Sequence, residues 1–452
     1  MASDIHAPGY APAPTTAFEG GRLYRTLRFA VNVRPNEVAA LLWSCLYVFA
    51  VLSAYYVIRP IRDEMGVQGG VDNLQWLFTG TLLAMLAVNP PFSALVRRLP
   101  RKRFISITYR FFMLNLLVFV ACFALATPGQ HVWLGRAFFI WASVFNLFVV
   151  SVFWALMVDV FDSEQGKRLF GFIAAGASVG AIFGSSVIVG LAKNIEPTFL
   201  LFASIVFLEI AVISVAQLSR LSRALHNVPG GGETPIGGSV IAGFTHTLRS
   251  PYLLNGAAFI LLYTVTSTFL YFQQAGIVAS AFADRAARTQ FFGQIDLLVN
   301  VLTLVVQVFL TSRILRMLGV AVTLALLPIL SVVGFGALAL APTIGVLVAL
   351  QVVRRVGNFA VARPTRELLF TVIAREDKYK AKTFIDTVIY RAGDQIGSWS
   401  YAFLVFLGLG IAGISLVAVP LSVAWVINSL WLGRKQDLME KAGTVIPATG
   451  RS

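Results

Sequence analysis

The chain has 452 residues, of which 57% are hydrophobic and only 13% charged, and its formal net charge is +15. In soluble globular domains about a quarter of all residues are charged, so this composition excludes a soluble globular protein and predicts an integral membrane protein. Two cysteines and four scattered histidines indicate neither a disulfide framework nor a metal site, and no basic region with interleaved aromatics indicates a nucleic-acid partner.

Twelve apolar segments are each long enough to cross a bilayer as a helix. They predict an all-α integral membrane protein with twelve transmembrane helices. The eleventh segment is the most polar, because it contains Asp386, Arg391 and Asp394. Residues 1–17 have no apolar core, so we expect no signal peptide. In chain order the predicted spans are residues 38–57, 74–96, 104–126, 137–158, 169–192, 199–218, 252–274, 291–312, 320–341, 343–362, 384–406 and 408–432.

Six spans lie on each side of a long polar loop whose stretch 229–239 is rich in glycine and proline, as is typical of a flexible linker. A shift of 213 residues superposes Gly180 on Gly393 and Gly184 on Gly397. Two parallel six-helix bundles related by a pseudo-two-fold repeat resemble the major facilitator transporters, whose substrate site lies between the halves. The expected divisions are a cytoplasmic tail (1–36), an N-terminal bundle (37–218), a cytoplasmic linker (219–250), a C-terminal bundle (251–433) and a second cytoplasmic tail (434–452).

The basic residues predict the orientation in the membrane. If both termini are cytoplasmic, 26 of the 36 lysines and arginines fall on cytoplasmic tails and loops, which satisfies the positive-inside rule. We therefore expect a multi-pass protein of a bacterial-type cytoplasmic (inner) membrane. The same loops are expected to contact anionic lipid headgroups, which accounts for the net charge without nucleic acid.

The first span ends in a charged cluster that includes Arg59, Arg62 and Asp63. Pro60 breaks the helix locally, and the two arginines stand on the side of the membrane that the charge rule disfavours. Two interpretations remain open. The arginines either extend to the outer interface as a cap of the helix or face the interior and bind substrate.

Spans seven and eight each carry polar side chains at helical spacing. Two polar faces in lipid would both be costly, so we expect them to line a shared wet interior; hydrogen bonds between helices are the alternative. Asp296 is expected either to take a coupling proton or to orient a basic neighbour, and Tyr263 and Tyr271 to stack on a base or ring. The two faces comprise Tyr263, Ser267, Tyr271 and Gln274 on one span and Asp296, Asn300, Thr303 and Gln307 on the other.

Arg354 and Arg355 occupy the middle of the tenth span. Arg354 lies roughly 16 Å from its outer end, near the midplane of a hydrocarbon core about 30 Å thick. A charge there costs at least about 2.5 kcal/mol, so it indicates a watery cavity or an anionic partner. Adjacent helical positions point about 100° apart. One arginine is therefore expected to face the cavity while the other pairs within the bundle; extension of both to the interface is the alternative.

Two short motifs resemble the ATP:ADP antiporter family, the nucleotide transporters of plastids and intracellular bacteria. The first is the end of span one, where Arg59, Arg62 and Asp63 occupy the family's arginine, lysine and aspartate positions. The second runs from span ten into span eleven, where Arg366 keeps the family's charge and Asp394 replaces a family lysine. Its outright matches are Pro364, Glu367, Lys380, Lys382, Asp386 and Gly393. The resemblance implies nucleotide transport and implies that Lys380, Lys382 and Asp386 belong to the substrate site.

These observations predict a secondary active transporter of an organic anion, a nucleotide or another phosphorylated metabolite, that works by exchange or by ion coupling. Arg59, Arg62, Arg354 and Arg355 are expected to bind phosphate or carboxylate. Arg391 and Asp394, three residues apart, form either a structural ion pair or part of the site. The alternatives are a proton-coupled carrier of a non-nucleotide solute or drug, and a transport-inactive scaffold or sensor. No catalytic residues or cofactor are expected, because no nucleophile, metal cluster or acid/base pair has recognisable spacing.

Overall fold

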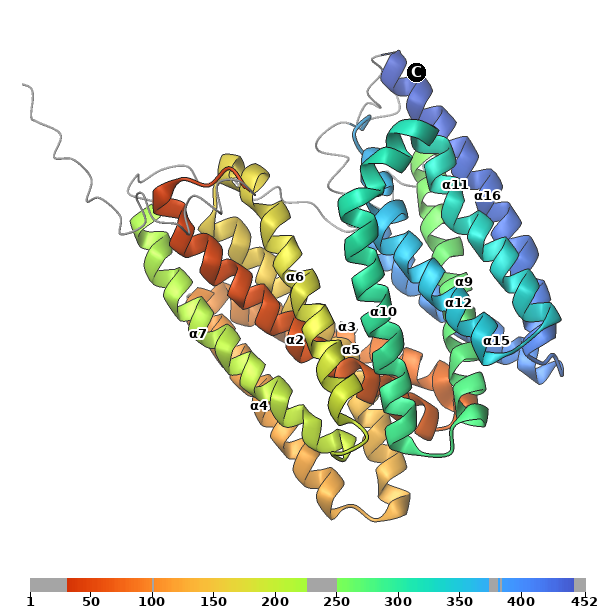
Figure 1. Ribbon diagram of the computed structural model, residues 1–452, viewed down its shortest axis with the longest axis horizontal. Helices are drawn as coiled ribbons and strands as arrows, with labels where there is room; N and C mark the ends of the chain where they lie inside the picture. Colours follow the sequence, from red (N-terminus) through yellow and green to blue (C-terminus); the bar gives the residue numbers. More distant parts are fainter. Residues whose placement is uncertain (1–30, 100, 226–249, 374–380, 383, 443–452) are drawn as a thin grey trace, which may run out of the picture.

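The computed structural model describes residues 31–99, 101–225, 250–373, 381–382 and 384–442. The described residues form helices and no strand, in two bundles that lie side by side (Figure 1). The predicted all-α fold is thus confirmed. Most of the expected linker and most of both expected tails lie outside the described residues.

The first bundle is formed by six long helices and three short 3-10 turns. Its longest helices, α2 and α5, have 31 and 33 residues. They are longer than the roughly 20 residues that cross a hydrocarbon core of about 30 Å at 1.5 Å per residue. Prolines inside α2 (Pro60) and α3 (Pro90, Pro91) mark places where an intrahelical hydrogen bond is missing. The elements are η1 (Pro35–Glu37), α2 (Val38–Gln68), η2 (Val71–Asn73), α3 (Leu74–Arg98), α4 (Arg101–Leu125), α5 (Pro128–Val160), α6 (Ser163–Leu191), η3 (Pro197–Leu200) and α7 (Leu201–Leu225).

The second bundle contains two helices that are broken by π-helical turns. The tenth predicted span is α12, the π-turn η4 and α13, and the eleventh is the π-turn η5 followed by α15. π-turns inside helices occur frequently at functional sites. The elements are α9 (Pro251–Ala281), α10 (Arg285–Phe309), α11 (Thr311–Leu340), α12 (Ile344–Val356), η4 (Gly357–Ala362), α13 (Arg363–Leu368), η5 (Ile385–Ile389), α15 (Tyr390–Phe406) and α16 (Ile411–Lys441).

Eleven segments in the described part of the chain are long and apolar enough to span a membrane. They coincide with eleven of the twelve predicted spans. The remaining span corresponds to η5 and α15, of 5 and 17 residues, which carry Asp386, Arg391 and Asp394. Its three charged residues make this segment more polar than the other predicted spans.

Glycines allow two pairs of helices to pack at backbone contact. A Cβ atom at Gly180 or Gly184 of α6 would overlap the backbone of Phe49 or Ser53 of α2. At the positions 213 residues later, a Cβ atom at Gly393 or Gly397 of α15 would collide with α9. Small residues permit this close approach between membrane helices. The sequence repeat is therefore expressed as equivalent packing of α6 on α2 and of α15 on α9.

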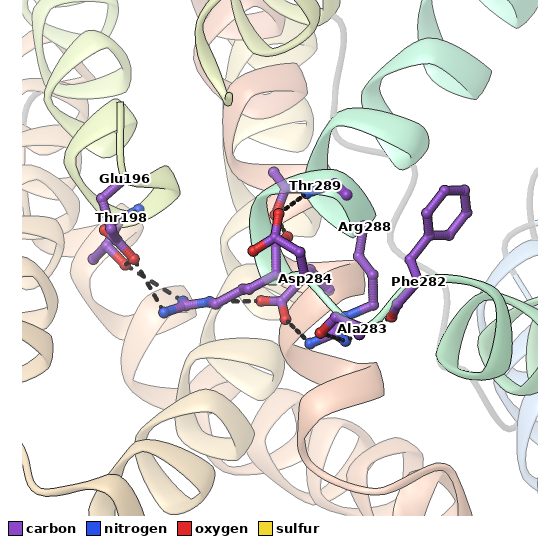
Figure 2. Close-up of polar contacts among 10 residues, drawn as sticks. Glu196, Thr198, Phe282, Ala283, Asp284, Arg288 and Thr289 are labelled. Carbon is purple, nitrogen blue, oxygen red and sulfur yellow. Dashed lines mark hydrogen bonds and ion pairs between the residues drawn. The ribbon is translucent and has the colours of Figure 1, made fainter. Parts of the chain in front are cut away.

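The two bundles are tied together at the end that is remote from the start of α2 and the end of α16 (Figure 1). There the fully buried Glu64 of α2 accepts hydrogen bonds from Nε of Arg285 and from Nη2 of Arg288, both at 2.9 Å. Arg285 also pairs with Glu196, at 3.1 Å, beside Thr198, and Arg288 also donates to the carbonyl oxygens of residues 282 and 283 (Figure 2). We call Glu64, Glu196, Arg285 and Arg288 the distal clasp.

A second connection between the bundles joins α3 to α15. Thr79 donates to the side chain of Gln395 at 3.0 Å and accepts a hydrogen bond from the indole of Trp399 at 3.1 Å. The rings of Trp76 and Trp399 meet edge to face with centroids 4.8 Å apart. Together with the distal clasp, this contact joins the two bundles on the side away from the termini.

Candidate functional site

A cavity of about 300 Å³ lies between the two bundles and is lined by both of them. Its size falls at the lower end of the range for small-molecule sites, about 300 to 1,000 Å³. The part of α2 around Pro60 reaches it from one side together with α3 and α5, and α9, α10, α12 and α15 reach it from the other. The charged lining residues are Arg59, Arg62, Asp63, Asp296, Arg354, Arg355, Arg391 and Asp394.

The charged lining of the cavity is positive. Five arginines face three aspartates, and burial reduces the screening of each charge by water. Excess positive charge in a partly dry cavity attracts an anion and disfavours a cation. The arrangement is therefore chemically suited to hold a carboxylate or phosphate.

Asp296 joins the two bundles through arginines. Its Oδ1 lies 2.7 Å from Nη2 of Arg355 and 3.4 Å from Nη1 of Arg59, and the side chain is only 3% exposed. Its Oδ2 has no hydrogen-bond partner among the described residues, and neither has the buried Nε of Arg59. One aspartate thus serves two arginines, so part of the hydrogen-bonding capacity of each guanidinium is left for a ligand.

Asp63 forms a second polar group at the same level. Nη2 of Arg62 lies 2.6 Å from its Oδ1, and the phenol of Tyr271 donates to the same oxygen at 3.0 Å. Arg59 lies farther away, 3.9 Å from Oδ2. Arg59 and Arg62 are 18% and 14% exposed and turn toward the cavity, so the structure supports an interior location over an interfacial cap.

Arg354 and Arg355 differ in their surroundings, as their adjacent positions on the helix lead one to expect. Arg355 pairs with Asp296. Arg354 is 3% exposed and donates to the hydroxyls of Ser331, at 3.1 Å, and Thr266 and to the carbonyl oxygen of Tyr263, at 3.2 Å. Among the described residues no carboxylate pairs with Arg354. Its guanidinium instead sits among the rings of Tyr263, Phe335 and Trp425, with distances of 5.7 to 5.9 Å to the centroids.

Arg391 and Asp394 form an ion pair within α15, with Nη1 to Oδ2 at 3.1 Å, and both line the cavity. The two interpretations from sequence therefore do not exclude each other, since the ion pair is local and its residues also lie in the cavity wall. Tyr390, next to Arg391, lies 6.3 Å from Tyr263, centroid to centroid, and adds an aromatic surface at this corner.

The structure gathers ten of the fourteen predicted site residues around the cavity and leaves three outside it. Asn300 is buried on α10 one turn beyond Asp296 but does not line the cavity. Lys382 pairs with Glu367, and Asp386 pairs with Arg366 at 3.2 Å, in the region between α13 and η5. Lys380 lies outside the described residues. The ten are Arg59, Arg62, Asp63, Tyr263, Tyr271, Asp296, Arg354, Arg355, Arg391 and Asp394.

Several lining residues were not predicted from sequence. Phe78 of α3 and Phe139, Ser143 and Asn146 of α5 complete the wall on the side of the first bundle. The spacing of Ser143 and Asn146 on one helical face inside an apolar run was the available signal. Gln351, one turn before Arg355, donates to Gln274 and also lines the cavity. These groups offer neutral hydrogen bonds and ring surfaces beside the charged centre.

The described residues contain no group of three or more histidine, cysteine, aspartate or glutamate side chains placed to hold a metal ion. The aspartates of the cavity pair with arginines instead. The candidate site is therefore composed of guanidinium groups, carboxylates, amides and aromatic rings.

Comparison with known proteins agrees with this architecture. The family model of the Major Facilitator Superfamily matches residues 25–376. The ADP,ATP carrier protein 1 of Chlamydia muridarum is 22% identical over 360 residues, which cover 68% of each chain. The carrier of the same name from Chlamydia trachomatis serovar D is 21% identical over 363 residues, 69% of this chain and 68% of the relative. The resemblance predicted from the two motifs is thus confirmed at the level of distant similarity.

Two solved structures show the same fold. A bacterial homologue of the iron transporter ferroportin, in an inward-facing state, aligns with a TM-score of 0.60 at 13% identity and covers 89% of this chain and 98% of its own. A bacterial homologue of the human lysosomal transporter Spinster, in an inward-facing and unoccupied conformation, aligns with a TM-score of 0.54 at 12% identity, covering 90% and 98%. At such low identity these likenesses establish the fold and not the cargo.

Proposed function

This chain belongs to the major facilitator superfamily and is a membrane transporter, and we propose that its cargo is an organic anion, a nucleotide or another phosphorylated metabolite. The observation that carries the proposal is the excess of arginine over aspartate around one cavity between the bundles. A carrier of a cation or a neutral solute has no need of five guanidinium groups around one cavity, since each charge is costly at membrane depth.

The residues divide the site into two parts. Arg59 and Arg355 each have a buried donor, Nε and Nη2, without a hydrogen-bond partner among the described residues. They would bind the phosphate or carboxylate through charge-assisted, bidentate hydrogen bonds. Tyr271 and Phe78, whose ring centroids are 5.7 Å apart, would contact a base or sugar ring. The amides of Asn146 and Gln351 would donate to its polar edge. The distant similarity to ADP,ATP carriers favours a nucleotide among the phosphorylated anions.

Transport would follow alternating access, with rocking of one bundle against the other around the cavity. The distal clasp and the contact between α3 and α15 close one side of the cavity, so cargo would enter from the side of the termini. We propose that this side is cytoplasmic and that the protein resides in a bacterial-type inner membrane. The energy would come from exchange of anions or from an ion gradient.

Uptake by purified protein in liposomes tests the proposal. The panel consists of ADP, glucose 6-phosphate, succinate and a neutral sugar, each measured with and without a pH gradient. We expect saturable uptake of at least one phosphorylated anion. At a subsaturating concentration of that anion, we expect Arg355→Gln to reduce its uptake to the background level. Uptake of the neutral sugar alone, or of no anion at all, would show that the proposed cargo is wrong.

A further inference from the structure

Asp296 is the carboxylate of the cavity whose ion pairs connect the two bundles. It belongs to α10 and pairs with Arg355 of α12 in its own bundle, at 2.7 Å, and with Arg59 of α2 in the other, at 3.4 Å. The other two aspartates of the cavity pair with arginines of their own helices, Asp63 with Arg62 and Asp394 with Arg391. Asp296 therefore has a position that no other carboxylate of the described lining shares.

The two arginines that Asp296 holds are also the ones that an anionic cargo needs. The remaining ion pair of Arg59 is the long one to Asp63, at 3.9 Å. Arg62 and Arg391 each donate a hydrogen bond to an aspartate of their own helix, at 2.6 and 3.1 Å. By contrast, the buried Nε of Arg59 and Nη2 of Arg355 have no hydrogen-bond partner among the described residues, so Arg59 and Arg355 are the cations of the cavity most available to a ligand. A cargo oxygen placed between them would meet the negative charge of Asp296, and like charges at such a distance strongly disfavour each other.

We propose that Asp296 is an internal counter-anion that competes with the cargo for Arg59 and Arg355. In the empty carrier its carboxylate holds the two arginines and ties α10 to α2. A bound anion replaces it at the arginines, which breaks this tie between the bundles and permits them to rock. Because the empty carrier keeps the tie, it reorients slowly, and the protein exchanges one anion for another. This inference rests on the proposed function, since it assumes an anionic cargo.

The competition predicts that a mutation inside the binding site increases the affinity for the cargo. Replacing Asp296 by asparagine removes the competitor while keeping nearly the same shape, so affinity for the anion should rise by about tenfold or more, as expected for a close pair of charges. The increase should grow with the charge of the cargo, from AMP to ADP to ATP. A residue that binds cargo directly, or that only supports the fold, would weaken binding when it is replaced.

Binding and efflux together test the inference on the full-length chain in liposomes. Affinity is measured for the adenine nucleotides, and liposomes loaded with labelled ADP are then diluted into buffer with or without external ADP. We expect the wild type to release label only with external ADP, and Asp296→Asn to release it in both cases. Asp296→Glu, which keeps the charge, should restore dependence on external ADP.

A charge-matched comparison is available at Asp394, which lines the same cavity but pairs within its own helix. Asp394→Asn makes the same change in net charge and leaves the tie between α10 and α2 intact. Release without external ADP by this variant as well would overturn the assignment to Asp296. Weaker or unchanged ADP binding by Asp296→Asn, combined with weaker binding by Arg355→Gln, would overturn the inference and leave the proposed function in place. Wild-type ADP binding by both variants would also overturn the inference, whereas failure of the wild type to bind any anion would overturn the proposed function.

Discussion

The distal clasp offers the sharpest quantitative prediction. Glu64 is fully buried, and each of its oxygens accepts one arginine at 2.9 Å. In Glu64→Gln the amide keeps one acceptor oxygen but points an NH₂ group at the second arginine, so a donor faces a donor. Removal of one partner of a buried ion pair costs about 3 to 5 kcal/mol.

The lower end of that range applies to Glu64→Gln. Arg285 keeps Glu196 at 3.1 Å, and Arg288 keeps two carbonyl oxygens at 3.0 Å. Both arginines are also partly exposed, by 20% and 13%. We therefore expect the state with the distal side closed to lose about 3 kcal/mol relative to the state with that side open, which is roughly a hundredfold change in their ratio.

Chemical labelling can measure this ratio. The assay uses a chain in which Cys45 and Cys122 are replaced by serine and Ser267, which lines the cavity, is replaced by cysteine. A membrane-impermeant maleimide is added on the side opposite the termini, and the rate at which it labels the cysteine is measured. We expect the labelling rate to rise roughly a hundredfold with Glu64→Gln. Glu196→Gln is the matched control, because Glu196 is 45% exposed and such pairs contribute about 0 to 1 kcal/mol. Equal labelling rates for the two variants would refute the role assigned to Glu64.

Three further predictions follow from the same structure. Arg355→Gln should weaken anion binding by about one to two orders of magnitude, and lysine at the same position should restore binding in part. Arg354→Gln should chiefly lower the melting temperature, because the donors of Arg354 are held by the protein. An equal loss of affinity in the two glutamine variants would contradict this division. Gly184→Leu should destabilise the protein by about 1 to 3 kcal/mol through overpacking against α2. Gly190→Leu on the same helix should change stability by about 0.5 kcal/mol or less, because a Cβ atom at Gly190 has no neighbour within 4 Å. Thermal unfolding in detergent compares the two variants. Reporter fusions after Ser219 and after Arg434 should both read as cytoplasmic, and a periplasmic signal from either would show that the predicted orientation is wrong.

The sequence alone determined the class of protein and the main features of its fold. Apolar runs of sufficient length, the polar loop between the two halves and the glycines repeated at a shift of 213 residues are all local patterns. They follow from the cost of leaving backbone or charge in lipid, which acts on each segment separately. For the same reason the depth of Arg354 and Arg355 in an apolar helix indicated a polar interior before any contact was known.

The tertiary structure decided how the charges are paired. Asp296 meets Arg59 from a helix more than two hundred positions earlier, and Glu64 meets Arg285 and Arg288 across the same interval. Lys382 and Asp386, which the family resemblance placed in the site, pair outside the cavity instead. Helical spacing fixes which side chains share a face. An ion pair between helices, however, forms only where their packing brings both charges within about 4 Å, and that depends on the whole bundle.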